Sequence, residues 1–227
     1  SDVLSIHSNY SKENKDRFFA GIPKIKAKAK DKMEIYQLFL QHIIYSLKPG
    51  GKAAVVLPTG FITAQSGIDK KIRQHLVDNK MLAGVVSMPS NIFATTGTNV
   101  SILFIDDSNK DKVVLVDASN LGQKVKEGNN QKTVLTPEEE QQVIDVFNNK
   151  WTEEDFSVAV SYDEIAAKNY SLSAGQYFEV KIEYVDITAE RFAEKMRGFS
   201  SNLDSLFKQS RELEVEIKKQ LAGLKYE

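Results

Sequence analysis

The chain has 227 residues, of which 41% are hydrophobic and 27% are charged, and its formal net charge at pH 7 is −1. These values are ordinary for a globular chain that buries a substantial core, and they exclude fibrous or fully disordered material. The near-zero charge also excludes a bulk basic footprint, so any contact with nucleic acid has to come from a local patch.

The composition also limits compartment and metal chemistry. No apolar run approaches the length of a membrane span, and the N-terminus lacks a basic segment followed by an apolar one. We therefore expect a cytoplasmic protein that makes no membrane contact. Cysteine is absent and the three histidines, His7, His42 and His75, are scattered, so we expect no metal site.

A run of lysines is the first candidate patch along the chain. Five lysines alternate with Ile25, two alanines and Asp31, at Lys24, Lys26, Lys28, Lys30 and Lys32. One interpretation is contact with DNA phosphates, where lysines release counterions and make affinity salt-dependent. The alternative is a solvated loop, which is the usual fate of a charge run.

The next elements predict a helix and a buried strand. Residues 38–47 have helical spacing, and the apolar face that we expect to be buried holds Tyr36, Phe39, Leu40, Ile43 and Leu47. Lys48-Pro49-Gly50-Gly51 ends this helix. Residues 52–57 then form a nearly continuous apolar run, typical of a parallel strand covered on both faces. Such a strand delivers its carboxyl end to a ligand crevice, so Pro58, Thr59 and Gly60 are predicted to border the functional site.

A second helix and strand follow. Residues 68–79 predict a surface helix with Ile72, Leu76 and Val77 inside, and with Lys70, Lys71, Arg73 and Gln74 outside. Residues 81–88 predict a strand. The loop after it, residues 90–98, offers hydroxyls and amides, among them those of Thr96, Gly97 and Thr98. These groups either line a ligand site or simply make turn bonds while Ile92 and Phe93 cap the core. Gln41 and His42, like His75, are interpreted as structural polar residues rather than catalytic ones.

Two further apolar strands are predicted at 100–105 and 113–117. Because the turn between them is short, we expect antiparallel neighbours there, and hence a mostly parallel sheet with an antiparallel edge. Residues 120–134 are rich in glycine and polar side chains, with Lys124, Lys126 and Lys132, and predict an exposed loop.

Three helix starts are predicted after this loop, at Thr136, Trp151 and Ser161. The first is the clearest, with threonine as N-cap, then proline and two acids. From residue 138 to residue 164 there are nine acidic residues and one lysine. This surface should repel DNA.

The C-terminal tail has a heptad pattern. Apolar residues at 4-3 spacing form a seam that we expect to bind a partner helix, at Phe192, Met196, Phe199, Leu203, Leu206, Leu213 and Ile217. The alternative is that the helix packs back on its own domain. A lone helix of this kind is marginal in water, which favours a partner.

Several of these motifs together resemble one family. FLQHIIYSLKPGGKAAVVLPTGFI at residues 39–62, then IRQHLVD, VVSMPSNIFATTGTNVSILFID and VDAS, occur in the order and at the spacing typical of methylation subunits of type I restriction-modification systems. The resemblance covers roughly residues 10–177. It implies an α/β fold, namely the distal half of a Rossmann-like methyltransferase sheet followed by a helical C-terminal tail.

The resemblance also implies an activity. Members of this family transfer a methyl group from S-adenosylmethionine to the exocyclic amine of adenine in DNA, in complex with a specificity subunit and, in the full assembly, a restriction subunit. The glycine-rich turn that holds the donor lies upstream in such proteins, so we expect the donor-binding motif to be absent here. Of the family's Asn-Pro-Pro-aromatic turn, only the base-stacking position is matched, by Tyr10 in His7-Ser8-Asn9-Tyr10. Tyr170 to Tyr177 resembles the segment that closes the methyltransferase region.

These expectations divide the chain into three segments: the catalytic-domain half at 1–135, a closing segment at 136–185 and an assembly helix at 186–227. The first functional hypothesis is part of an adenine-specific DNA methyltransferase, inactive as this isolated fragment. The second is a non-catalytic interaction module that assembles through its C-terminal helix with a specificity subunit or with itself. A dehydrogenase-like domain ranks below both, because no Gly-x-Gly-x-x-Gly is present.

Overall fold

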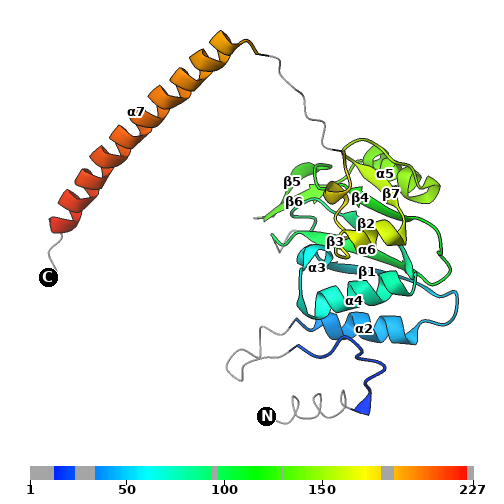
Figure 1. Ribbon diagram of the computed structural model, residues 1–227. Coiled ribbons are helices and arrows are strands. Elements are labelled where there is room, and N and C mark those ends of the chain that lie inside the picture. Colours follow the sequence, from blue (N-terminus) through cyan, green and yellow to red (C-terminus); the bar gives the residue numbers. More distant parts are fainter. Residues whose placement is uncertain (1–12, 24–33, 94–96, 129, 180–186, 224–227) are drawn as a thin grey trace. The chain divides into compact units, whose positions relative to one another are not determined.

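The computed structural model describes residues 13–23, 34–93, 97–128, 130–179 and 187–223. The chain divides into two compact units, one ending at Glu179 and the other starting at Val180. The first unit contains a five-stranded sheet with its covering helices and a two-stranded hairpin, and the second contains one long helix (Figure 1). The three-segment division expected from the sequence stays a prediction.

The five-stranded sheet confirms the expected α/β class. In sheet order its strands are β1 (Lys52–Pro58), β3 (Val100–Asp106), β2 (Leu82–Ser87), β4 (Val113–Asp117) and β7 (Ser157–Val160). β3 is antiparallel to both β1 and β2, β2 is parallel to β4, and β4 is antiparallel to β7. The expected pairing was therefore wrong in detail, because the sheet is mostly antiparallel with one parallel pair. As predicted, β1 and β2 do run in one direction.

The difference comes from the position of β3. The turn between β3 and β4 reverses the chain, as expected from its length, but the two strands are not neighbours. β3 instead lies between β1 and β2, where it is hydrogen-bonded along both edges. Local apolar patterning identifies strands but does not say which strands pair, so this arrangement was not accessible from the sequence.

Alternation along the strands divides the core between the two faces of the sheet. Val85, Val113 and Leu115 face one cluster, whereas Val86, Val114 and Val116 face the other. Helices α2 (Tyr36–Ser46), α4 (Gly67–Asp78) and α6 (Tyr162–Ala167) contribute to the first cluster, and α5 (Pro137–Asn149) contributes to the second. The strands are thus covered on both faces, which explains their nearly continuous apolar sequences.

Helix α2 differs from the expected amphipathic pattern. Its buried residues are Gln37, Leu40, Gln41 and Ile44, whereas Phe39 is 61% exposed. The buried face of α2 is rotated relative to the predicted one, because two glutamines are buried with their side-chain amides hydrogen-bonded. A prediction from apolar residues alone cannot anticipate buried glutamines.

The helix starts after the sheet agree with the sequence in two of three cases. Thr136 and Ser161 each form a capping box at the N-terminus of α5 and α6. The predicted start at Trp151 was wrong, because the chain there makes a turn, with a bridge between Glu153 and Ser157, and then enters β7. The serine hydroxyl of Ser157 donates to the carbonyl of Trp151 and stabilises this turn.

The region expected to be an exposed loop is a β-hairpin. Strands β5 (Gln123–Glu127) and β6 (Asn130–Val134) pair in antiparallel register, with Lys124 opposite Thr133 and Val125 opposite Lys132. In Figure 1 the hairpin lies at the same end of the first unit as the short helix α3 (Gly60–Thr63). Its lysines and valines alternate with the two-residue period of a strand. The loop was predicted from the polar composition, which does not take this alternation into account.

The second unit is helix α7 (Ala189–Ala222), preceded by Thr188, whose side chain accepts a hydrogen bond from the Arg191 amide. All seven residues of the predicted seam are exposed by between 50% and 62%: Phe192, Met196, Phe199, Leu203, Leu206, Leu213 and Ile217. In the described part of the chain, α7 included, no helix combines the length and the apolar character that a bilayer crossing requires.

Candidate functional site

The carboxyl ends of β1, β2 and β4 meet at one end of the sheet, together with the start of β3, and we call this end the rim. In the strand register Pro58 lies opposite Val100, and Ser87 lies opposite both Ser101 and Asp117. In open α/β sheets ligands bind outside the carboxyl ends of the strands. The rim is therefore the candidate site.

Hydrogen bonds join two rim loops. The Thr59 amide donates to the Asn99 carbonyl at 3.0 Å, and the hydroxyls of Thr59 and Ser101 are 3.1 Å apart. The Met88 amide donates to the Val100 carbonyl at 3.0 Å. The loop after β1 and the segment entering β3 are thus held in contact, although 40 positions separate Thr59 from Asn99 in the sequence.

The structure brings together most of the rim residues that it describes. Pro58, Thr59 and Gly60 lie at the end of β1, and Gly97 and Thr98 are exposed immediately before Asn99. The remaining predicted site residues fall outside the described residues, namely Tyr10, Lys24, Lys26, Lys28, Lys30, Lys32 and Thr96.

Arg73 of α4 holds the segment that follows the rim residue Thr59. Its role was not predicted from the sequence. The expectation that it faces outward was wrong, because its side chain is 0% exposed. Its guanidinium donates to the carbonyl oxygens of Phe61, Ala64 and Tyr170. Burial lowers its pKa, and nearby Asp69 opposes that change. Arg73 thus fixes helix α3, which follows directly from Thr59.

A signal for this buried arginine was present in the sequence. Asp69, Ile72, Arg73 and Leu76 fall at helical spacing on the buried stripe of α4. Asp69 accepts hydrogen bonds from the Tyr36 hydroxyl at 2.9 Å and from the Gln37 amide at 2.8 Å. Burial and this carboxylate raise the pKa of Tyr36. An acid and a base four residues apart within an apolar stripe indicate such a network.

The two polar side chains of α2 that were interpreted as structural behave differently. Gln41 is fully buried; its side-chain oxygen accepts from the Ala20 amide at 2.8 Å and its nitrogen donates to the Gly21 carbonyl at 3.0 Å. It therefore fixes the segment that precedes the lysine run. His42 is exposed. His75 stacks on Phe19 with ring centroids 4.0 Å apart, and burial lowers its pKa.

The segment from Tyr170 to Tyr177 closes the unit behind α3. The Leu172 amide donates to the Ile62 carbonyl at 3.0 Å, and the Tyr177 hydroxyl donates to the Ser171 carbonyl at 2.6 Å. Burial, followed by the nearby Glu164 carboxylate, raises the pKa of Tyr177 to about 12. The hydroxyl therefore stays protonated and able to donate at neutral pH.

The β5–β6 hairpin is attached to the rim. The Thr133 amide donates to the Asn91 carbonyl at 2.9 Å and its hydroxyl donates to the Ser90 carbonyl at 2.6 Å. Immediately before β5, the Gly122 amide donates to the Glu139 carboxylate of α5 at 2.9 Å. This bond and the bonds to Thr136 lower the pKa of Glu139. Three lysines that were expected on an exposed loop thus belong to an anchored hairpin, in which Lys124 and Lys126 are exposed and Lys132 is half-buried.

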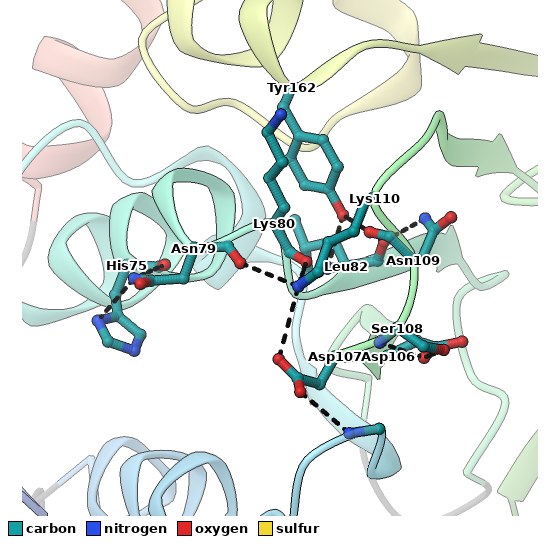
Figure 2. Close-up of polar contacts among 11 residues, drawn as sticks. His75, Asn79, Lys80, Leu82, Asp106, Asp107, Ser108, Asn109, Lys110 and Tyr162 are labelled. Atoms are coloured by element: carbon teal, nitrogen blue, oxygen red, sulfur yellow. Dashed lines mark hydrogen bonds and ion pairs between the residues drawn. The ribbon is translucent and has the colours of Figure 1, made fainter.

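The opposite end of the sheet carries a denser set of polar contacts, which Figure 2 shows. The Tyr162 hydroxyl lies 2.8 Å from the Leu82 carbonyl, 2.6 Å from the Asn109 carbonyl and 3.1 Å from the Leu82 amide. The Asn109 side chain donates to the Leu82 carbonyl at 2.6 Å, and Lys110 donates to the Lys80 carbonyl at 3.0 Å. These contacts close the turn between β3 and β4, which is a structural task.

A metal site and a methyl-donor site each require particular groups to come together. Within them no group of three or more metal-ligating side chains comes together. The amino-acid sequence contains no Gly-x-Gly, and among the described rim residues the polar groups that make hydrogen bonds are hydroxyls and backbone amides and carbonyls. A groove of about 500 Å³ lies by Lys52, Phe104 and Phe147, at the end of the sheet opposite the rim. The expectation that the donor-binding motif is absent stays a prediction.

Comparison with known families identifies the class. The family described as N-6 DNA Methylase matches residues 4–185, so the chain belongs to that family. This match confirms the family expected from the Lys-Pro-Gly-Gly and Leu-Pro motifs, and it covers the whole rim.

Curated relatives narrow the comparison to one kind of subunit. The chain is 30% identical over 189 residues to the type I restriction enzyme MpnII methylase subunit of Mycoplasma pneumoniae, covering 82% of this chain and 33% of the relative. It is 30% identical over 201 residues to the HindI methylase subunit of Haemophilus influenzae, covering 83% of this chain and 43% of that subunit. The chain thus spans less than half the length of these relatives.

A solved structure agrees with the fold. The methyltransferase subunit of a type I restriction-modification system from Streptococcus thermophilus superposes with a TM-score of 0.62 at 24% identity, over 76% of this chain and 34% of that one. At this identity the likeness supports the fold alone.

Proposed function

We propose that this chain is the distal part of an adenine-specific DNA methyltransferase subunit of a type I restriction-modification system. The intact enzyme would transfer a methyl group from S-adenosylmethionine to the N6 amine of adenine in DNA. The observation that carries the proposal is the N-6 DNA Methylase match over residues 4–185. The sheet geometry supports it, because the loop after β1 and the end of the loop after β2 are hydrogen-bonded to each other at the rim.

In this proposal the rim receives the target adenine. An enzyme that modifies a base in a duplex has to extrude it from the stack into a pocket. The bonds of Thr59 to Asn99 and Ser101 would hold one wall of that pocket in place. Gly97 and Thr98 would face the DNA because they are exposed. Tyr10 would stack on the extruded base, and the lysines at 24–32 would contact phosphates.

Binding of the methyl donor is assigned to residues outside this chain, because the chain has no glycine-rich turn of the required kind. The 227-residue chain is therefore expected to show no binding of S-adenosylmethionine in titration calorimetry and no methyl transfer. Stoichiometric binding at micromolar concentration would contradict this assignment and would restore a complete donor site.

Activity is tested with the complete polypeptide whose sequence contains this chain, mixed with its specificity subunit. We expect N6-methyladenine to accumulate in target DNA, measured by mass spectrometry of the digested nucleosides. Tyr10→Ala is expected to lower the rate by at least about tenfold, the equivalent of losing about 1.4 kcal/mol of stacking. Tyr45→Ala, an exposed tyrosine on α2, is the matched control. No methylation by the unsubstituted complex would overturn the proposed function.

A second candidate function rests on the exposed seam of α7. Seven large apolar side chains along one helix, each at least half exposed, are the pattern of a helix that binds another helix. This module would assemble the chain with a specificity subunit or with a second copy. Leu206→Glu with Leu213→Glu should abolish complex formation in sedimentation velocity, whereas Lys208→Glu with Glu212→Lys, off the seam, should not. Unchanged sedimentation with and without the specificity subunit would remove this function.

A further inference from the structure

The β5–β6 hairpin is the one strongly basic element among the described residues that the proposed function does not use. It carries Lys124, Lys126 and Lys132 against one acidic residue, Glu127, and it precedes a helix whose first turn holds three glutamates. The chain as a whole has a net charge of −1. The lysines are therefore a local positive patch beside an acidic one, as a protein needs when only one face is to meet a polyanion.

Hydrogen bonds at both roots of the hairpin fix its position on the first unit. A two-stranded hairpin alone is marginally stable in water, so its position depends on its attachments. Thr133 is 4% exposed and is bonded to Ser90 and Asn91, in the loop that follows β2. Gly122, at the other root, has φ +85°, and a Cβ there would lie 2.6 Å from the Thr133 methyl group. The hairpin is thus fastened to the loop after β2 through Thr133 and to α5 through the bond between Gly122 and Glu139.

The two faces of the hairpin are both suited to a nucleic-acid groove. Lys124 and Lys126 share one face, because they are two residues apart in a strand, and Lys132 lies on the other face opposite Val125. Val125 and Val134 are 42% and 43% exposed, so that second face combines a cation with apolar groups. The major groove of DNA admits a two-stranded β-ribbon, and apolar side chains contact thymine methyl groups there.

From these observations we propose that the β5–β6 hairpin contacts the backbone of duplex DNA beside the rim, with Lys124, Lys126 and Lys132 on phosphates. The inference rests on the proposed function, since it supplies the substrate contact of the same site. Its task is to position the duplex, because phosphate contacts fix register and carry no sequence information. The partner is double-stranded DNA of any sequence.

The test measures binding of the full 227-residue chain to a fluorescent duplex by anisotropy, from about 50 to 200 mM salt. The triple variant K124Q/K126Q/K132Q should bind at least about tenfold more weakly at low salt. Its slope of log K against log salt should be shallower by about 2 to 3, because each phosphate contact contributes about 0.9. Circular dichroism checks that the variant stays folded.

The matched control is K71Q/K80Q/K112Q, which removes the same charge from exposed positions on α4 and at the amino ends of β2 and β4. It should leave the slope unchanged. Equal losses in both triple variants, an unchanged slope in the hairpin variant, or no binding of duplex by the unsubstituted chain would each overturn the hairpin proposal. The methyltransferase proposal is judged by methylation in the complete complex, so the two can fail separately.

Discussion

The two ends of the sheet are built in different ways. At the amino ends of β2 and β4, the side chains of Tyr162, Asn109 and Lys110 bond to backbone groups of three neighbouring segments (Figure 2). At the rim, the loops are joined by a few bonds around Thr59 and Asn99, and Gly97 and Thr98 are exposed. One end is thus closed by side chains that bond to the backbone, whereas the loops of the other end, where we propose that substrate binds, are more exposed.

We expect the largest effect on stability from substitution of Arg73, because the loops at the rim depend on this buried side chain. Arg73→Ala leaves the carbonyls of Phe61, Ala64 and Tyr170 without their donor. We expect the free energy of unfolding to fall by at least about 3 kcal/mol, since each buried unpaired acceptor costs about 1 to 3 kcal/mol. Urea denaturation measures the change.

The control for Arg73 is Lys71→Ala, an exposed residue of the same helix, which should change stability by less than about 0.5 kcal/mol. A loss below about 1 kcal/mol in the Arg73 variant would mean that α3 does not depend on the guanidinium.

The closed end is tested by Tyr162→Phe. This change removes the hydroxyl between Leu82 and Asn109 while keeping the ring in the core. We expect a loss of about 1 to 2 kcal/mol, because the Leu82 carbonyl keeps its bond from Asn109. Tyr45→Phe, at an exposed tyrosine of α2, is the comparison in the same thermal or urea unfolding series. Equal stability of the two variants would remove the distinction between the ends.

The smallest effect is expected at the rim itself. Thr59→Val keeps the shape of the side chain and removes its hydroxyl bond to Ser101. The loss should be about 0.5 to 1.5 kcal/mol, the usual net contribution of one hydrogen bond. Thr63→Val, at the end of the short helix α3 that follows Thr59, is the control in the urea series. A loss above about 2 kcal/mol would show that the rim is as rigid as the closed end.

The stability of the segment around Tyr177, behind α3, should depend on alkaline pH. The pKa of Tyr177 is raised from the ordinary value of 10.0 to about 12, so folding favours its protonated form. Its contribution to stability is complete below pH 10 and is lost as the pH rises from about 10 through about 12. Tyr177→Phe should therefore flatten the fall in melting temperature over this range. An identical fall in the variant would assign the alkaline loss to other groups.

The sequence predicted those features that depend on neighbours along the chain. The capping threonine before α5 and the serine before α6 were identified because a cap requires a particular residue at a particular spacing. The ends of β1 and β2 were also found, since Pro58 and Pro89 follow apolar runs. These placements were enough to locate the rim.

Features that depend on distant partners could not be predicted. Arg73 and Gln41 are buried only because carbonyl and amide groups far along the chain satisfy them. The hairpin was missed because Thr133 is held by Ser90, 43 residues earlier in the chain, and lysine-rich strands have weak local propensity. The sequence does contain one signal for the hairpin, because the Gly128-Asn129 pair stands between two segments in which lysine alternates with other residues.

The position of β3 has a consequence for the order in which the chain folds. Its two neighbours, β1 and β2, precede it in the sequence and pair with it rather than with each other. During synthesis, therefore, neither strand has this partner until the ribosome has passed Asp106. Long-range pairing of this kind slows folding, so we expect the first unit to acquire its native sheet late and in one concerted step.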